Sequence, residues 1–448
     1  MQDIGLIKKR GYVFSITWPI FVELILQMLV GNADQMMVSH YSQSAVGAIG
    51  NANQMVGLLI LFFNVVSMAS TILITQYIGA GQSKKAEEIY SLSILVNLLA
   101  GVAVSVLLIF GSRSLYTLMK VPEQLMDETC RYSSIIGWGM VFQSLYSTFV
   151  ALFRSNAMMK VTMLVSVILN VVNIGGNFFL ISGFGPIPAF GVAGAALASN
   201  LSRLVGLLVL IVLFQKLVGV RLSLRVLRPF PFHQLAKLMR IGIPSGGESM
   251  SYSLSQLAVQ AMCNLLPVFV INTKAFASTF AMVSYIFASA IAQATQVLVG
   301  YLMGARHAEE ADRRVMSTLK LAMAVSTLLA AILFFFSDPL FGLFTSDAGV
   351  MRLGKKILAV EIILEIGRAM NIVLVGALQA AGDIRFPIYV SVINVWIIAV
   401  GAGYLLGVSM GWGLFGIWVA MAADECIRGV ILLVRWRRGK WKSKNLLA

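Results

Sequence analysis

The chain has 448 residues, of which 58% are hydrophobic and 12% are charged. Soluble domains carry roughly 25% charged residues, so the composition excludes an ordinary soluble protein. The formal net charge of +15 could suit a nucleic-acid-binding protein, but the positions of the basic residues argue against that class.

Long apolar runs recur from one end of the chain to the other. Each is about 20 residues or longer, enough to cross roughly 30 Å of hydrocarbon as a helix. The runs are continuous rather than alternating, and lipid admits only helices or closed barrels, so the sequence predicts an all-α integral membrane protein with twelve transmembrane helices. The predicted spans are 14–38, 47–77, 89–112, 132–154, 160–183, 190–215, 240–265, 275–302, 317–336, 356–380, 386–407 and 412–434.

Basic residues cluster in alternate loops and in both tails. If the N-terminus is cytoplasmic, most of the 34 Lys and Arg residues fall on the inner side, which is the positive-inside pattern of a multi-pass membrane protein. This distribution predicts cytoplasmic termini and no nucleic-acid partner. The inner set includes Lys8, Lys9, Arg10, Lys84, Lys85, Arg221, Arg225, Arg228, Arg313, Arg314 and the tail from Arg435 to Lys444.

The chain contains an internal repeat with an offset of 225 residues. Pro19 and Glu23 open the first run, and Pro244 and Glu248 open the seventh; Gly79 with Gly304 and Arg203 with Arg428 keep the same offset. Six helices per half give both halves one orientation, which predicts two six-helix lobes related by a parallel pseudo-two-fold repeat. The predicted domains are an N-lobe at 1–215, a basic cytoplasmic linker at 216–239, a C-lobe at 240–434 and a basic tail at 435–448.

Asp34 interrupts the first apolar run, within the sequence LQMLVGNADQMM at 26–37. Ionisable residues inside a membrane are expensive and point to function. The repeat places Val259 opposite Asp34. A carboxylate that both lobes required for their structure would appear in both halves. Asp34 appears in the first half only, so it predicts a functional site there.

Polar residues of the fifth run add to this candidate site. Asn170, Asn173 and Asn177 share one helical face, and Ser199 lies one run further on. Amide, hydroxyl and carboxylate oxygens suit a hard cation, whereas a lone carboxylate in apolar surroundings could carry a proton. A hydrogen-bond cluster that only holds helices together is the structural alternative.

The second half has its own charged set, which the first half does not repeat. Glu361, Glu365 and Arg368 fall on one helical face. Glu365 and Arg368 could neutralise each other, which leaves Glu361 as the spare carboxylate. Glu23 and Glu248 are duplicated and therefore favour architecture, although Glu248 could line a central space.

Motifs for other functions are missing from the sequence. There is no P-loop, HExxH or GxSxG, which argues against an ATP-driven pump and the common membrane hydrolases. The three cysteines show no disulfide or zinc spacing. We therefore expect neither an enzyme nor a cofactor beyond a coupling ion.

The sequence resembles the MATE (multidrug and toxic compound extrusion) transporters. The first run resembles the opening helix of that family, with Pro19, Gln27 eight residues later and Asp34 fifteen residues after the proline. GVAGAALAS at 191–199 resembles the entry of its sixth helix, and ALQAAGDIRFP at 377–387 its tenth-to-eleventh connection. The resemblance implies a two-lobe exporter of organic cations and amphipathic compounds, driven by inward movement of protons or sodium.

The resemblance also implies particular site residues. The family's first-lobe cation site corresponds here to Asp34, Asn173, Asn177 and Ser199, and Asp34, Asn173 and Asn177 would be metal ligands if sodium drives transport. Asn177 stands where many members have an aspartate, which favours protons slightly. Gln27, Glu248, Glu361, Glu365 and Arg368 are the candidates for a substrate cleft between the lobes or for a C-lobe polar cluster, although the acid of the sodium-coupled branch falls deeper in the seventh helix than Glu248.

The expected function is therefore a cation-coupled antiporter of the inner membrane, working as a monomer on small amphipathic or cationic substrates. The alternative is a flippase for a lipid-linked sugar, because related two-lobe folds move such lipids. A flippase should present several basic residues to phosphates, and the intramembrane candidates are few: Arg203, Arg368 and Arg428.

Overall fold

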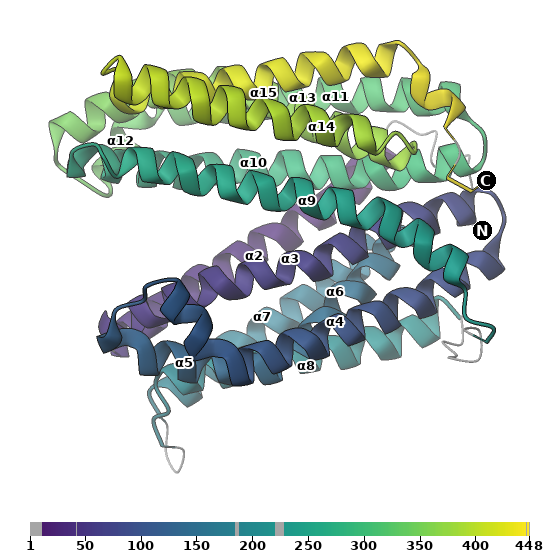
Figure 1. The fold of residues 1–448 in the computed structure, drawn as a ribbon, viewed down its shortest axis with the longest axis horizontal. Helices are drawn as coiled ribbons and strands as arrows, with labels where there is room; N and C mark the ends of the chain where they lie inside the picture. Colours follow the sequence, from purple (N-terminus) through teal and green to yellow (C-terminus); the bar gives the residue numbers. More distant parts are fainter. Residues whose placement is uncertain (1–10, 42, 184–187, 220–227, 445, 448) are drawn as a thin grey trace. The chain divides into compact units, whose positions relative to one another are not determined.

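A computed structural model describes residues 11–41, 43–183, 188–219, 228–444, 446 and 447. Within these residues the chain is helical and contains no β-strand (Figure 1). Part of the predicted linker, 220–227, lies outside the described residues, as does the predicted basic cluster at Lys8, Lys9 and Arg10. Helix α8 continues to Leu217 and α9 begins at Phe232, so helix occupies both ends of the predicted linker.

The helices follow the predicted runs closely. The first half contains α2 (Tyr12–Tyr41), α3 (Gln43–Gly79), α4 (Ser83–Leu118), α5 (Glu123–Trp138), α6 (Met140–Ser155), α7 (Met159–Ile181) and α8 (Val192–Leu217). The second half contains α9 (Phe232–Cys263), α10 (Val268–Gly304), α11 (Ala308–Phe335), α12 (Ser337–Gly342), α13 (Ala348–Ala380), α14 (Arg385–Asn394), the π-helical stretches η2 (Val395–Ala402) and η3 (Leu405–Ser409), α15 (Gly413–Arg437) and the short η4 (Lys440–Ser443).

Most of these helices are long and apolar enough to cross a membrane. Among the described residues, eight satisfy both conditions alone, and α5 with α6 satisfies them only as a pair bent by 51°, where the sequence predicted one helix at 132–154. The remaining long helices, α9, α13 and α15, carry the charged and polar side chains of the second half, such as Glu248, Glu365 and Arg428. Their composition is less apolar because Glu365 and Arg428 are buried among helices and Glu248 is half-buried.

The chain divides into two compact units. We call residues 22–77 and 82–243 the N-lobe, and residues 244–448, with the described residues up to Phe21 and residues 78–81, the C-lobe. In the N-lobe, α7 packs along α8, and α4 packs against α5 and α6. In the C-lobe, α13 is central because it packs against α10, α11 and α15. Inward-facing residues of both lobes therefore come from several helices at once.

Small residues allow α13 and α15 to approach each other closely. A Cβ atom on Gly367 of α13 would lie 2.5 Å from the backbone nitrogen of Cys426 and 2.7 Å from the carbonyl carbon of Glu425. Gly429 of α15 faces the same crossing, and a Cβ there would lie 3.2 Å from the Gly367 carbonyl oxygen. Glycines at a helix crossing let backbones pack in contact inside a membrane.

Substituting Gly367→Ala should therefore destabilise the C-lobe by about 1–3 kcal/mol, because the backbone of α15 must move to admit the methyl group. Thermal unfolding of the purified protein in detergent measures this effect. Gly376→Ala is the matched control in the same helix, where an added Cβ would meet its nearest neighbour at 3.5 Å. Equal stability of the two variants would contradict the close crossing.

Candidate polar pocket in the N-lobe

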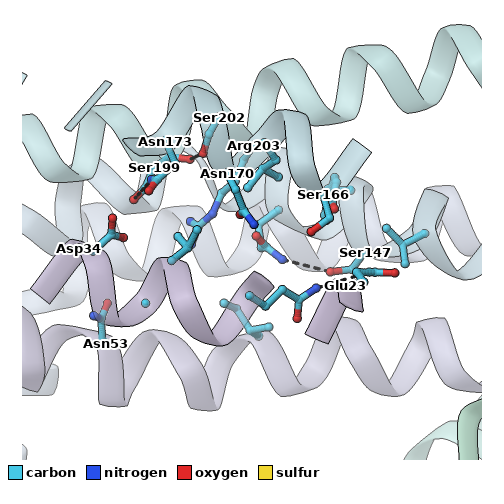
Figure 2. Close-up of a pocket in the computed structure, with 18 of the residues that line it drawn as sticks. Glu23, Asp34, Asn53, Ser147, Ser166, Asn170, Asn173, Ser199, Ser202 and Arg203 are labelled. Atoms are coloured by element: carbon cyan, nitrogen blue, oxygen red, sulfur yellow. Dashed lines mark hydrogen bonds between the residues drawn. The ribbon is translucent and has the colours of Figure 1, made fainter. Parts of the chain in front are cut away.

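The N-lobe contains a cavity of about 430 Å³ lined by polar and charged side chains (Figure 2). This volume lies within the range of about 300–1,000 Å³ that is typical of small-molecule sites. Helices α2, α3, α5, α6, α7 and α8 all contribute. The lining residues that the sequence analysis had singled out are Glu23, Gln27, Asp34, Asn170, Asn173, Ser199 and Arg203.

One face of α2 supplies the first wall of this pocket. Glu23, Gln27, Gly31 and Asp34 recur at helical spacing and line the cavity together. Asp34 is half-buried, and Figure 2 shows its carboxylate on the same side as the asparagines of α7. The aspartate in this apolar run therefore faces a polar interior.

The four predicted cation-site residues form a chain of hydrogen bonds. The Asn177 side-chain amide donates to the Asp34 carboxylate and, at 3.3 Å, to Asn173 Oδ1. The Asn173 amide in turn donates to Ser199 Oγ at 3.3 Å. Asn173 and Asn177 are buried, so α2, α7 and α8 meet at this chain. The prediction that these residues lie together is confirmed, whereas their role in binding a cation remains a prediction.

The amide oxygen Asn177 Oδ1 is buried and accepts no hydrogen bond within the described part of the chain. Buried polar atoms are nearly always hydrogen-bonded, so an exception calls for an explanation. An oxygen beside a carboxylate is the donor type that a hard cation uses. The residues present therefore fit a small cation held by oxygens of Asp34, Asn173 and Asn177.

Glu23 lies in the same wall but has permanent partners. Its carboxylate accepts from Arg154 Nη2 at 2.9 Å and from Thr162 Oγ1 at 2.8 Å, and Gln27 Nε2 lies 3.5 Å away. The Glu23 side chain is fully buried. Ion pairing and hydrogen bonding neutralise this carboxylate, which agrees with the architectural role suggested by its duplication.

The C-lobe cluster corrects one inference from the sequence. Arg368 pairs with both Glu365 and Glu361, the latter at 3.2 Å, so Glu361 is not a spare carboxylate. The inference was wrong because a long guanidinium side chain reaches carboxylates three and seven positions earlier on the same face. Residues from other helices complete the cluster: Trp418 Nε1 donates to Glu361 at 2.6 Å, and Ser284 Oγ donates to Glu365 at 2.5 Å.

A second C-lobe cluster was missed from the sequence. Arg428 pairs with Asp424 at 2.6 Å and with Glu425 at 3.0 Å, and Asn371 donates to Glu425 at 2.8 Å. The spacings of three and four residues before Arg428 were a readable signal for these pairs. Glu248 lies near this cluster, since it lines a small cavity with Arg428.

A polar pocket in a lobe built from membrane-spanning helices fits a multi-pass membrane transporter. The MatE family pattern matches residues 19–179 and again 244–405. The chain belongs to this family, and the two matches begin 225 residues apart, which confirms the repeat. It is a transporter and not an enzyme, with twelve transmembrane helices in two six-helix lobes as the sequence predicted.

Individual relatives match the chain over almost its whole length. "Uncharacterized transporter YisQ" of Bacillus subtilis is 36% identical, over 98% of this chain and 96% of that protein. "Probable multidrug resistance protein NorM" of Thermotoga maritima is 26% identical, over 100% of this chain and 96% of that protein. A solved structure described as "MATE in the bent conformation" shares the fold with a TM-score of 0.89 and 19% identity, covering 99% of this chain and 98% of the other.

Proposed function

We propose that this protein is a cation-coupled antiporter that exports amphipathic, often cationic, organic compounds across a bacterial inner membrane. The observation that carries the proposal is the hydrogen-bonded chain of Asp34, Asn177, Asn173 and Ser199, of which all but Asn177 line a drug-sized pocket. The relatives named as multidrug resistance proteins support the substrate class. The excess of basic residues in alternate loops and tails supports cytoplasmic termini.

Coupling follows from competition for one negative charge. An organic cation in the pocket is attracted to the Asp34 carboxylate. A proton or sodium ion bound there removes that charge, so the pocket holds the organic cation less firmly. Each ligand shifts the conformational equilibrium only by its differential affinity for the two states, and the two ligands favour opposite states.

The residues favour the proton over sodium as the coupling ion. Asp34 is the one carboxylate in the hydrogen-bonded chain, because position 177 is an asparagine. A carboxylate in partly apolar surroundings readily accepts a proton, because burial disfavours its charged form.

Transport into proteoliposomes of purified protein tests the function. An imposed pH gradient should drive movement of the fluorescent cation ethidium, and a sodium gradient at equal pH should drive it less. If neither gradient moves any organic cation, while a lipid-linked sugar crosses the membrane, the antiporter proposal is wrong.

Asn177→Asp should shift the coupling toward sodium. A second carboxylate would stand beside Asp34, and two charged oxygens bind a hard cation more firmly than one. Sodium-driven ethidium transport should therefore rise relative to proton-driven transport. Asn156→Asp is a control, since Asn156 lies at the end of α6 and hydrogen-bonds to Tyr90 instead of Asp34. An unchanged ratio in Asn177→Asp would count against Asn177 as a cation ligand.

A further inference from the structure

The Arg203 guanidinium is a half-buried positive charge for which the proposed ion exchange has no direct use. Arg203 lies on α8 and lines the N-lobe pocket with Asp34. Its Nη1 atom is buried and makes no hydrogen bond, and Arg203 has no ion pair among the residues that the structure describes. The second pocket arginine, Arg154, is paired with Glu23. Asp34 and Arg203 are thus the two pocket charges without an ion-pair partner.

The internal repeat shows that this arrangement is specific to the N-lobe. Arg428 is the repeat equivalent of Arg203 and is neutralised by Asp424 and Glu425. At the positions equivalent to those carboxylates, the N-lobe has Ser199 and Asn200. The Asn200 amide donates to the carbonyl oxygen of Ile135. The same helical position therefore carries an ion-paired arginine in one lobe and, among the described residues, an arginine without an ion pair in the other.

A second hydrogen-bond donor of the pocket also lacks a partner. Asn170 Nδ2 is buried and makes no hydrogen bond to any described residue. Figure 2 shows Asn170 and Arg203 in the middle part of the pocket and Asp34 toward one end. A guanidinium with a buried, unbonded Nη1 atom, near an amide donor without a partner, matches the acceptor oxygens of an anionic group such as a carboxylate.

We propose that Arg203 binds the carboxylate of an amphoteric substrate whose cationic group is held at Asp34. Opposite charges at two places in one pocket complement a molecule that carries both signs. A compound with only a positive charge would leave the guanidinium uncompensated. The inference rests on the proposed function in one respect, that this pocket is the substrate site. It adds the substrate class and the residue that selects it.

Two dyes that differ only in an ester test this inference. Rhodamine 110 carries a xanthylium cation and a carboxylate, and rhodamine 123 is its methyl ester and carries only the cation. Fluorescence anisotropy measures equilibrium binding of each dye to the full-length protein in nanodiscs. In Arg203→Met, the affinity for rhodamine 110 should fall by at least about tenfold, because a charge-assisted hydrogen bond is lost. The affinity for rhodamine 123 should stay unchanged or rise.

Two further variants separate recognition from loss of structure. Arg203→Lys keeps the charge and loses the planar fork, so it should weaken rhodamine 110 binding less than Arg203→Met does. Arg113→Met removes an exposed arginine outside the pocket and should change neither affinity. The proposal is wrong if Arg203→Met changes both affinities equally or leaves both unchanged, or if the wild-type protein binds neither dye.

Titrations in chloride and in gluconate distinguish the dye carboxylate from an inorganic anion. If Arg203 holds chloride, binding of both dyes will depend on chloride, and the affinity ratio will be the same in Arg203→Met; that result would overturn the proposal. The proteoliposome assay remains an independent test of antiport. If Arg203→Met weakens binding of rhodamine 110 alone but the wild-type protein shows no gradient-driven transport, the proposed function is contradicted. If the wild-type protein transports but Arg203→Met does not weaken rhodamine 110 binding selectively, this inference is contradicted.

Discussion

Replacing Asp34 with Asn should reduce gradient-driven ethidium transport to the rate of protein-free liposomes. The amide has nearly the same shape as the carboxylate and can still hydrogen-bond to Asn177, the partner seen in the structure. It cannot lose or gain a proton near neutral pH, and it offers a cation no negative charge. The variant should therefore fold and remain unable to exchange an ion for a substrate.

The control for this experiment is Asp127→Asn. Asp127 is an exposed carboxylate near Arg113, at 3.7 Å, and lies outside the pocket. Exposed pairs of this kind contribute little to stability, so this variant should transport and unfold like the wild type. Wild-type transport by Asp34→Asn under both a pH gradient and a sodium gradient would show that the coupling ion binds elsewhere.

Replacing Arg368 with Met should have the largest effect on stability, a loss of about 3–5 kcal/mol. The guanidinium compensates Glu361 and Glu365, whose side chains are 2% and 0% exposed. Removing it leaves two carboxylates in a poorly solvating interior. Thermal unfolding in detergent, followed by size-exclusion chromatography with fluorescence detection, should show a strongly lowered midpoint and a reduced folded fraction.

Neutralising the carboxylates should rescue that variant. Adding Glu361→Gln and Glu365→Gln to Arg368→Met removes the uncompensated charges, so much of the lost stability should return. Lys355→Met is the surface control, because Lys355 pairs with Asp338 where both side chains are about half exposed. An Arg368→Met protein as stable as the wild type, or a triple variant without recovery, would contradict the pairing described for this cluster.

The ion pairs of Arg368 and Arg428 argue against the flippase alternative. Arg368 and Arg428 each lie between two carboxylates, so neither presents a free positive charge to a phosphate. Arg203 remains as the N-lobe pocket arginine that has no ion pair among the described residues. One arginine opposite Asp34 suits a small amphoteric molecule better than a lipid-linked diphosphate, which carries several negative charges.

The helices and part of the site were readable from the sequence for physical reasons. A membrane span needs a long apolar run, so its position is recorded in composition alone. Asp34, Asn173 and Asn177 were found because a polar side chain in such a run is costly and therefore stands out. Helical spacing then placed the asparagines on one face, and the structure shows that this face meets Asp34.

Contacts between helices could not be read in the same way. Trp418, which donates a hydrogen bond to Glu361, lies 57 residues away on another helix, so no local pattern indicates this contact. The cavity walls from α3, α5 and α6, including Asn53 and Tyr132, depend on how six helices pack and not on any local pattern. That Arg203 has no ion pair in the described part of the chain also became visible only when its surroundings were known, although the repeat had already matched it with Arg428.

Ion release on substrate binding tests the central claim most directly. Purified protein in a weakly buffered detergent solution is mixed with a saturating organic cation, and released protons are followed with a pH-sensitive dye, or released sodium with a radioactive tracer. We predict that the wild-type protein releases its coupling ion when the substrate binds and that Asp34→Asn binds the substrate without releasing any. Equal release by both proteins would contradict the exchange of ions at Asp34.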